Sequence, residues 1–136
     1  MKYSEYSVVI VGSGAAGLYA ALKISQQINL PEGVLLLTKS YLGNSNSLYA
    51  QGGIVGVLHQ NPEDCVEKHV EDTLTAGAGL SDRSTVEYIS EASDEVINDL
   101  IENGVDFDRN ADGELTFTLE AAHSIRRILH AGGDAT

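Results

Sequence analysis

Hydrophobic and polar positions in the first forty residues follow the pattern of one β-α-β unit. Residues 6–11 form an apolar run rich in β-branched side chains, which is typical of a strand buried on both faces. Residues 29–33 contain Pro and Gly, which end a helix predicted over residues 15–28. The apolar residues 34–38 predict a second buried strand. The apolar face of the helix comprises Leu18, Ala21, Leu22, Ser25 and Ile28.

Two further helices are predicted in the middle of the chain. Asn61-Pro62-Glu63-Asp64 has the features of a helix start, with Asn as N-cap, proline at the first position and acidic side chains in the first turn. This helix continues over residues 65–76 and ends at Gly77-Ala78-Gly79. Ser81 or Asp82 caps a helix over residues 83–103, and Gly104 ends it in a left-handed conformation. The apolar face of that helix comprises Val86, Ile89, Ala92, Val96, Ile97, Leu100 and Ile101.

Short strands are predicted on either side of these helices. Residues 54–58 form an apolar run of strand length. Residues 105–109 and 114–119 alternate like the strands of a hairpin, and Asp112-Gly113 supplies the positive φ angles of its turn. Residues 128–131 indicate a last strand, followed by Gly132-Gly133-Asp134, a helix-cap signal. Because an intact domain rarely ends on such a signal, we expect the chain to be a fragment of a longer domain.

Composition and charge limit the class of protein. The chain has 136 residues, of which 43% are hydrophobic and 21% charged, as is ordinary for a soluble globular protein. The net charge of -12 argues against nucleic acid and anionic membranes as partners. One cysteine, Cys65, excludes an internal disulfide, and we expect it to be a small buried residue. Without a signal peptide or membrane span, the sequence indicates a cytoplasmic protein.

A metal site is not expected. His69 and the acidic residues around it are interpreted as the solvated face of a helix. The aspartates near residues 110–113 lack the ligand spacing of a calcium loop, so a hairpin is the better interpretation.

A glycine-rich turn between the first strand and helix is the clearest chemical signal. Gly12-Ser13-Gly14-Ala15-Ala16-Gly17 has the spacing GxGxxG. In such a turn the first glycine permits a tight bend, the second lets the backbone approach a pyrophosphate, and the third lets helix and strand pack closely. The helix N-terminus adds N–H donors and the positive end of its dipole. Because strand, helix and second strand are all present, we predict dinucleotide binding, with a purely structural turn as the alternative.

Two features after the second strand bear on the cofactor. Lys39 stands where an acidic residue usually accepts the ribose hydroxyls, so that acceptor is missing and an ammonium group could instead donate to a ribose or phosphate oxygen. Residues 41–53, YLGNSNSLYAQGG, form a long polar loop. A loop of this kind often wraps a cofactor with Asn, Ser and backbone amides as donors, although a solvated surface loop has the same composition.

Ionisable groups gather in residues 119–136, LEAAHSIRRILHAGGDAT, at a density that is unusual for a surface turn. They are Glu120, His123, Arg126, Arg127 and His130.

Several segments together resemble the flavoprotein family that comprises the L-aspartate oxidases and the flavoprotein subunits of succinate dehydrogenase and fumarate reductase. The chain is most similar to the aspartate oxidases within that family, which also carry lysine at the end of the second strand. The matching segments are VVIVGSGAAGLYAAL at 8–22, Thr38-Lys39, LYAQGG at 48–53, HVEDTLTAGAGLSD at 69–82 and HSIRRILHAGGDAT at 123–136.

This resemblance implies an α/β fold, a Rossmann-like FAD-binding domain of the glutathione-reductase type, truncated to its N-terminal part in residues 1–136. The capping domain and the C-terminal helical domain would be absent from this chain, and with them the His and Arg residues that hold the substrate carboxylates. Asn46 stands where covalent flavoproteins of the family have histidine, so FAD would be noncovalent. The implied FAD contacts are Gly12, Ser13, Gly14, Ala15, Ala16, Gly17, Lys39, Asn46, Ser47, Leu48, Tyr49, Ala50, Gln51, Gly52 and Gly53.

The implied reaction is oxidation of L-aspartate to iminoaspartate with O2 or fumarate as acceptor, the first step of NAD biosynthesis via quinolinate. The imine would pass to quinolinate synthase, and this fragment alone would be inactive. Glu120 would lie near the α-ammonium group of the substrate, with capping of a local turn as its alternative role. One or more residues of the HSIRR segment would face the flavin or the substrate, while the rest hold the loop. His123 and Ser124 are preferred for this role over Arg126 and Arg127. A soluble fumarate reductase and a complete nucleotide-binding module without redox activity are the rival interpretations.

Overall fold

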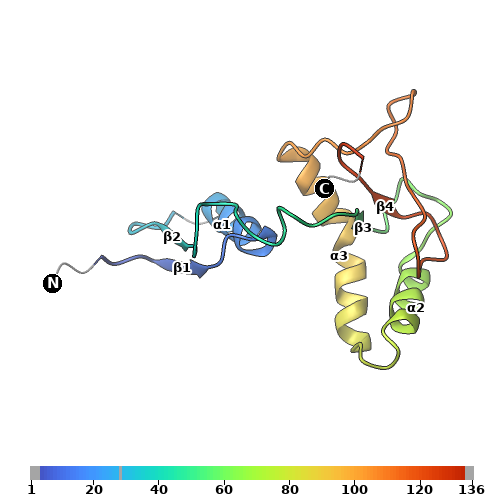
Figure 1. Ribbon diagram of the computed structural model, residues 1–136, viewed down its shortest axis with the longest axis horizontal. Helices are drawn as coiled ribbons and strands as arrows, with labels where there is room; N and C mark the ends of the chain where they lie inside the picture. Colours follow the sequence, from blue (N-terminus) through green and yellow to red (C-terminus); the bar gives the residue numbers. More distant parts are fainter. Residues whose placement is uncertain (1–3, 28, 134–136) are drawn as a thin grey trace. The chain divides into compact units, whose positions relative to one another are not determined.

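A computed structural model describes residues 4–27 and 29–133 of the chain. The chain divides into two compact units, residues 1–50 and 51–136, which are considered separately (Figure 1). Ile28, expected on a helix face, and Asp134, expected in a helix cap, lie outside the described residues. No helix within the described ranges is long and apolar enough to cross a membrane.

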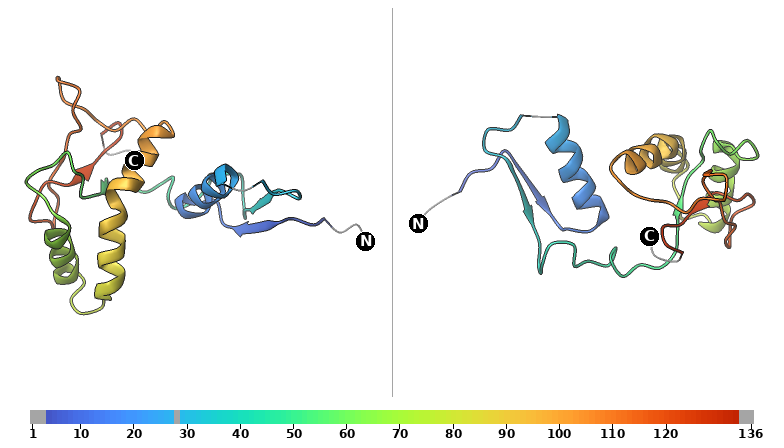
Figure 2. Two further views of the ribbon diagram at one scale, coloured as in Figure 1. Left: turned by 180° about the vertical axis from the view of Figure 1, so that it is seen from behind. Right: turned by 90° about the horizontal axis from the view of Figure 1, so that it is seen from above.

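The first unit is the β-α-β unit that the hydrophobic pattern predicts. β1 (Val8–Val11) pairs in parallel with β2 (Val34–Leu37), and both strands are slightly shorter than predicted. α1 (Ala15–Gln27) connects them and runs alongside the strands (Figure 2). β-Branched and leucine side chains favour the extended strands, whereas the alanine-rich sequence favours the helix. The parallel pairing with an intervening helix confirms the prediction.

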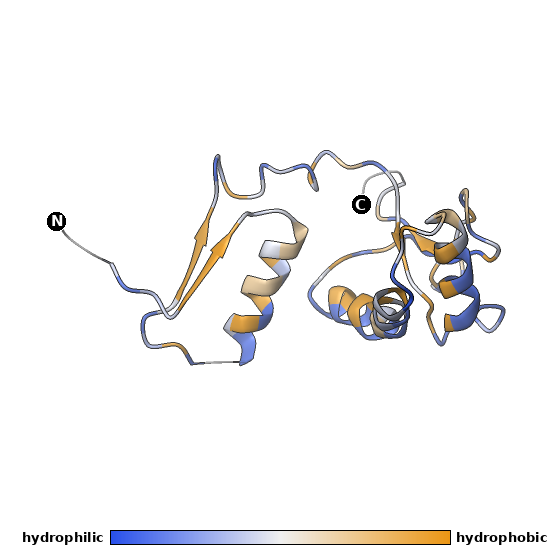
Figure 3. Ribbon diagram, turned by 90° about the horizontal axis from the view of Figure 1, so that it is seen from below, coloured by the Kyte–Doolittle hydropathy of each residue, from blue (hydrophilic) through white to orange (hydrophobic). Residues whose placement is uncertain are grey.

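The two strands are not buried on both faces, contrary to the sequence prediction. Val9, Val11 and Leu37 are 54%, 79% and 52% exposed. α1 covers one face of the two-stranded sheet, and no other described element of the first unit covers the opposite face. Figure 3 shows that both strands are strongly hydrophobic. A continuous apolar strand is buried on both faces only where layers pack on both.

The exposed apolar face predicts that the 136-residue chain self-associates. The unit also leaves strand edges open, and both features favour contact between molecules. We expect Val11→Lys to lower the average mass measured by size-exclusion chromatography with light scattering. Gln27→Lys adds the same charge at an exposed helix position and should leave the mass unchanged. A parent chain that stays monomeric at every concentration would contradict the prediction.

The second unit consists of two packed helices and a small antiparallel sheet. α2 (Val66–Ala76) and α3 (Arg83–Glu102) lie side by side (Figure 1). β3 (Ile54–Val55) pairs with β4 (Ile128–Leu129), so two predicted strands are present but shorter than expected. Each large apolar side chain that is fully buried in the core stabilises the unit by about 1.5–3 kcal/mol. The core residues are Leu58, Ile97, Phe107, Leu115 and Leu129.

α3 buries Ser90, Ser93 and Ile97, but its predicted apolar face is covered unevenly. Ile97 is completely buried, and Leu100 and Ile101 pack against the same core. Ile89, predicted on the same apolar face, is 61% exposed. The prediction of one buried face therefore holds for the second half of the helix and is wrong for Ile89.

The ends of α3 agree with the sequence, but the start of α2 does not. Asp82 is the N-cap of α3 and accepts a backbone N–H of the first turn, while Gly104 follows the helix with a φ of 98°. Asn61 is not the N-cap of α2, because the helix begins only at Val66; the side-chain amide of Asn61 donates instead to the carbonyl oxygen of Arg126 at 2.7 Å. Cys65, half-buried rather than buried, occupies the N-cap position instead. A local cap pattern cannot reveal such a distant partner.

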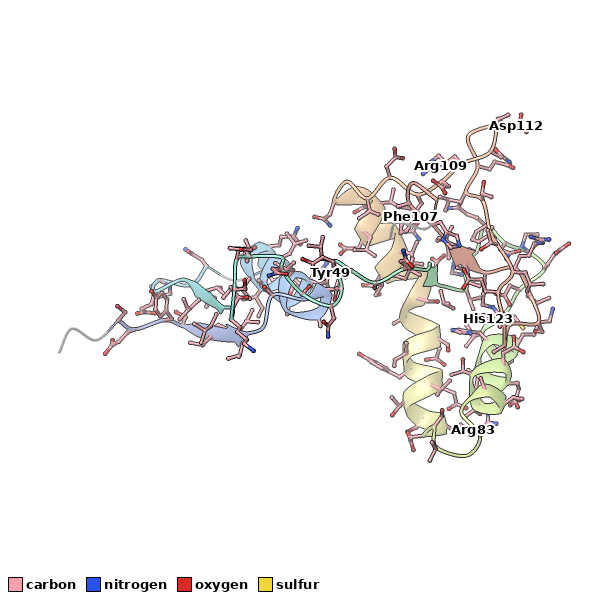
Figure 4. The ribbon with its side chains drawn as sticks, in the orientation of Figure 1. Tyr49, Arg83, Phe107, Arg109, Asp112 and His123 are labelled. Atoms are coloured by element: carbon pink, nitrogen blue, oxygen red, sulfur yellow. The ribbon has the colours of Figure 1, made fainter. Side chains whose placement is uncertain are left out.

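The predicted hairpin turn is present, but its extended strands are not. The N–H of Asn110 donates to the carbonyl oxygen of Glu114, and a single antiparallel bridge flanks the turn. Gly113 has a φ of 84°, whereas Asp112 is not in the left-handed region. The side-chain oxygen of Asn110 closes the turn by accepting the N–H groups of Asp112 and Glu114. Asp112 lies at the tip of the turn (Figure 4).

Candidate functional site

The glycine-rich turn of the first unit needs glycine at two positions, for different reasons. The N–H of Gly12 donates to the carbonyl oxygen of Leu37 at 2.8 Å and ties the turn to the end of β2. Gly12 has a φ of 111°, which favours glycine. A Cβ on Gly17 would overlap the carbonyl oxygen of Gly12. Gly12 and Gly17 therefore have the steric roles expected of a dinucleotide-binding turn.

Ser47, from the polar loop, meets this turn at the N-terminus of α1. Its hydroxyl accepts the N–H of Ala15 at 3.1 Å and lies 3.3 Å from the position of a Cβ on Gly14. Ser13 is buried, and its hydroxyl shares a hydrogen bond of 2.8 Å with that of Thr38. The structure thus brings the residues of the turn together with Ser47 at the positive end of a helix dipole, which suits an anionic oxygen.

The other predicted cofactor residues of the first unit lie at its surface. The loop folds on itself, because the Tyr49 hydroxyl donates to the side-chain oxygen of Asn44 at 3.1 Å. Figure 4 labels Tyr49. Exposed residues are Lys39, Asn46, Leu48, Tyr49 and Ala50.

Gln51, Gly52 and Gly53 belong to the second unit. Gln51 is exposed, and Gly52 has a φ of 132°. A Cβ on Gly53 would overlap the side chain of Ile128, so this glycine allows the close approach of β3 and β4. The predicted cofactor residues are thus divided between the two units.

A buried arginine lies next to His123 in the second unit. Arg127 is 0% exposed, and its Nε and Nη2 donate to the two carboxylate oxygens of Asp64, both at 2.7 Å. Its Nη1 donates to Oδ2 of Asp72 at 2.5 Å and lies 3.1 Å from Nδ1 of His123. Figure 4 shows His123 beside α2. Two carboxylates therefore satisfy a guanidinium that has no contact with water.

Asp72 connects this cluster to the segment that carries Glu120 and His123, the residues predicted to be catalytic. Its Oδ2 accepts the N–H and the hydroxyl of Ser124 at 2.8 and 2.7 Å. Burial alone would raise the pKa of Asp72, but the hydrogen bonds from Ser124 and Arg127 outweigh it and lower the pKa to about 2. The prediction that the acidic residues form a solvated helix face is therefore wrong for Asp64 and Asp72, because both bind the buried Arg127.

His69, on α2, also departs from the expected solvated position. It is half-buried, and its ring centroid lies 5.8 Å from that of His123. Burial and the nearby Arg127 lower the pKa of His69. Within residues 4–27 and 29–133 no group of three or more His, Cys, Asp or Glu side chains is arranged to hold a metal ion.

Glu120 and His123 lie at the two ends of one tight turn. The N–H of His123 donates to the carbonyl oxygen of Glu120 at 3.3 Å, and Ala122 between them has a φ of 68°, which is uncommon for a residue with a Cβ. The Glu120 side chain is 48% exposed, and its Oε1 lies 3.2 Å from Nε2 of His130. Nε2 of His130 also lies 3.0 Å from the hydroxyl of Thr118. The Glu120 carboxylate therefore contacts His130, while its backbone carbonyl closes the turn.

Comparison with known proteins shows the family of this chain. The family described as FAD binding domain matches residues 7–136. The chain belongs to this FAD-binding family. The matched range includes the turn, the polar loop and the segment around Glu120 and His123.

Relatives of this FAD-binding chain include the N-terminal parts of L-aspartate oxidases. The L-aspartate oxidase of Agrobacterium fabrum is 50% identical over 129 residues, which are 94% of this chain and 23% of that protein. The L-aspartate oxidase of Bacillus subtilis is 40% identical over 133 residues, which are 98% of this chain and 24% of that protein. The chain therefore spans only 23% and 24% of these relatives, and the resemblance inferred from its motifs is confirmed.

Solved structures of similar fold come from related flavoproteins. The apo form of the Mycobacterium smegmatis Sdh1 complex has a TM-score of 0.87 and 30% identity over 96% of this chain and 22% of that chain. A quinol-fumarate reductase with menaquinol molecules has a TM-score of 0.89 and 27% identity over 99% of this chain and 23% of that chain. The predicted α/β FAD-binding fold is confirmed.

Sequence reasoning missed the acidic partners of Arg127. Asp64 and Asp72 are separated from it by 63 and 55 residues, a distance that no local pattern spans. One signal was available, because Arg127 directly precedes the apolar pair Ile128–Leu129. An arginine held next to a buried strand requires acidic partners, and two aspartates eight positions apart near one helix are suitable.

The depressed pKa of Asp72 predicts a loss of stability in acid. A carboxyl whose pKa is lower in the folded state, about 2 against 3.8 for the ordinary group, stabilises the fold above pH 4, and this contribution disappears as the pH falls towards 2. It amounts to about 2 kcal/mol. In urea unfolding of parent and Asp72→Asn, we expect the difference in unfolding free energy to shrink between pH 4 and 2. A difference that stays constant over that range would contradict the assignment.

Proposed function

We propose that this chain is the N-terminal FAD-binding part of an L-aspartate oxidase. The observation that carries the proposal is the closed Gly12–Gly17 turn, with Ser47 at the N-terminus of α1, in a chain 40–50% identical to L-aspartate oxidases. FAD, when bound, would supply the oxidant: L-aspartate would lose a hydride from Cα and a proton from its amino group to give iminoaspartate, and O2 or fumarate would take up the two electrons as hydrogen peroxide or succinate. We further propose a cytoplasmic enzyme that begins NAD biosynthesis via quinolinate and delivers the imine to quinolinate synthase.

The residues of the first unit fit the pyrophosphate of FAD. Gly14 presents backbone without a Cβ, and the first turn of α1 contains no acidic residue that would repel a phosphate. We infer that Gly12–Gly17 and Ser47 hold the pyrophosphate, and that Lys39 donates to the ribose or a phosphate oxygen. The remaining contacts would come from Asn46 and residues 48–53.

Binding of FAD should be noncovalent, because Asn46 stands where related flavoproteins attach the flavin through histidine. The test is a visible absorption spectrum of the full-length protein before and after acid precipitation. We expect the flavin band to remain in the supernatant, and L-aspartate to bleach it in the native protein. A flavin that precipitates with the protein would contradict the noncovalent assignment, and a flavin that L-aspartate leaves oxidised would contradict the oxidase.

Glu120 is proposed to select L-aspartate over dicarboxylates that lack an amino group. Its carboxylate is half-exposed and suits an α-ammonium group. Loss of one charge-assisted hydrogen bond predicts that Glu120→Gln raises the KM for L-aspartate by about 10- to 100-fold. The KM for fumarate as acceptor should not change. Glu102→Gln, at an exposed helix end, is the matched control. An equal rise in both KM values would contradict a role in recognising the ammonium group.

A soluble fumarate reductase is the second candidate, and the similarity to fumarate reductase and succinate dehydrogenase structures favours it. The segment containing Glu120 and the HSIRRILHA run weighs against it. In the full-length protein, fumarate reduction by an artificial reductant without bleaching by L-aspartate would identify this activity. In either case we propose that the His and Arg residues holding the substrate carboxylates come from domains beyond this chain.

A further inference from the structure

We propose that Arg127 is a positioning residue that fixes the tautomer of His123, so that His123 offers a hydrogen-bond donor at Nε2. The proposal deepens the proposed function, since it takes His123 to face the substrate. It assigns a role to Arg127, whose charged side chain is completely buried. The position of the imidazole proton determines whether His123 can donate a hydrogen bond or accept a proton at Nε2.

The contact between the two side chains allows only one arrangement of protons. A guanidinium has five N–H donors and no acceptor, and it stays protonated in proteins. Because Nη1 of Arg127 lies 3.1 Å from Nδ1 of His123, Nδ1 must accept this hydrogen bond and carries no proton. The proton of the neutral imidazole is then at Nε2.

Arg127 cannot turn away from His123 without breaking its hydrogen bonds to Asp64 and Asp72. Its Nε and Nη2 are both held by Asp64, whose side chain is 0% exposed, and Nη1 is shared with Asp72. Asp72 also holds Ser124, the residue after His123, through two hydrogen bonds. The arrangement thus anchors the imidazole from the segment before α2 and from α2 itself, as a site needs for a preorganised group.

The neighbouring groups limit His123 to this role. His69 faces its ring from α2, and burial together with Arg127 lowers the pKa of His69. The two acidic groups of the cluster, Asp64 and Asp72, are directed at Arg127. Nε2–H is then the polar group that His123 can offer to a ligand, and it suits a carboxylate oxygen of a dicarboxylate substrate. Because Nε2 already carries a proton in this tautomer, His123 cannot act as a base by accepting a substrate proton at Nε2.

Two substitutions of His123 in the full-length protein distinguish a donor from a base. The side-chain amide of His123→Gln can present an N–H near the position of Nε2, whereas His123→Leu cannot. We expect kcat and the KM for L-aspartate to stay within about 10-fold in the Gln variant, and KM to rise by about 10- to 100-fold in the Leu variant. A loss of kcat of about 100- to 10,000-fold in both variants would indicate a base and overturn the proposal. Unchanged kinetics in both would overturn it as well.

A spectroscopic measurement tests the tautomer directly. Histidine ring ¹⁵N resonances of the full-length protein, assigned with His123→Gln, should show a proton on Nε2 and none on Nδ1 at pH 7.5. Arg127→Lys keeps the positive charge but replaces the planar fork by a single ammonium, so the two tautomers should mix and the KM for L-aspartate should rise. Arg83→Lys changes an exposed ion pair and should behave as the parent. A proton on Nδ1 in the parent, or an unchanged tautomer in Arg127→Lys, would overturn the proposal.

These measurements separate the inference from the proposed function. If Arg127→Lys does not fold, the parent spectrum and the two His123 variants still test the inference. A protein that does not oxidise L-aspartate would contradict the proposed function and leave the tautomer result valid. A protein that oxidises L-aspartate equally well with Gln or Leu at position 123 would contradict the inference alone.

Discussion

Replacing Arg127 by methionine is expected to lower the free energy of unfolding of the second unit by about 3–5 kcal/mol. Methionine fills a similar volume but donates no hydrogen bond, so the fully buried Asp64 would be left as an uncompensated charge. Asp72 would lose one of its donors and keep those of Ser124. Urea unfolding of the 136-residue chain, followed by circular dichroism at concentrations where it is monomeric, measures the loss.

Arg126 provides a matched control within the same pair of arginines. It is exposed, and Asn61 uses its backbone carbonyl only. Arg126→Met should therefore change the unfolding free energy by no more than about 0.5 kcal/mol. Adding Asp64→Asn to Arg127→Met removes the buried charge and should recover part of the loss. Equal losses for Arg126→Met and Arg127→Met would show that the buried cluster does not stabilise the unit.

Local patterns were sufficient to predict the β-α-β unit. Its strands, helix and turn follow from periodicity and from glycines within residues 6–38, and the parallel pairing agrees with them. The caps of α3 were also predictable, because Asp82 bonds within its own helix and Gly104 follows the last turn. These features depend on neighbours in the sequence, which is why one sequence is enough to find them.

Features that depend on distant residues were not predictable in the same way. Asn61 has the residue type of an N-cap but bonds to Arg126, 65 residues away. Val11 belongs to an apolar run that is typical of a buried strand, yet its exposure depends on which layers pack against the sheet. Sequence patterns therefore supplied the candidate site residues, whereas the contacts of Arg127 with Asp64, Asp72 and His123 became visible only in three dimensions.

The turn around Ala122 shows the same limit within the site. Alanine has no preference for a φ of 68°, and nothing in the sequence indicates the conformation. The segment is anchored on both sides, by the contact of Glu120 with His130 and by the hydrogen bonds of Ser124 to Asp72. Such anchoring can maintain an uncommon backbone conformation, and it is found here between the two proposed catalytic residues.

Electrostatics explains why the cofactor site relies on backbone groups. The chain has a net charge of -12 and few cations, yet FAD carries a pyrophosphate. The first turn of α1 contains no acidic residue, so in the proposed site its N–H groups and dipole would face the phosphates without a nearby negative charge. The geometry of the glycine turn should therefore control FAD affinity more strongly than any single charged side chain does.

Replacing Gly17 by alanine is accordingly expected to weaken FAD binding to the full-length protein by about 10- to 100-fold, because overpacking against backbone of this kind costs about 1–3 kcal/mol. The new Cβ would overlap the carbonyl oxygen of Gly12, which cannot move freely because the Gly12 N–H is bonded to Leu37. The helix would have to shift away from the turn that is proposed to hold the phosphates. Titration of the apoprotein with FAD, followed by quenching of flavin fluorescence, measures the affinity.

Gly14→Ala separates this steric effect from a direct effect on the phosphates. The closest neighbour of its Cβ would be the hydroxyl of Ser47 at 3.3 Å, and a side-chain hydroxyl can rotate away, unlike a backbone carbonyl. We therefore expect Gly14→Ala to keep the thermal stability of the apoprotein while weakening FAD binding, and Gly17→Ala to lower both. Parent-like FAD affinity in Gly17→Ala would contradict the steric argument. Parent-like affinity in Gly14→Ala would instead show that the pyrophosphate does not approach the backbone at this glycine, so each variant tests a different step of the proposal.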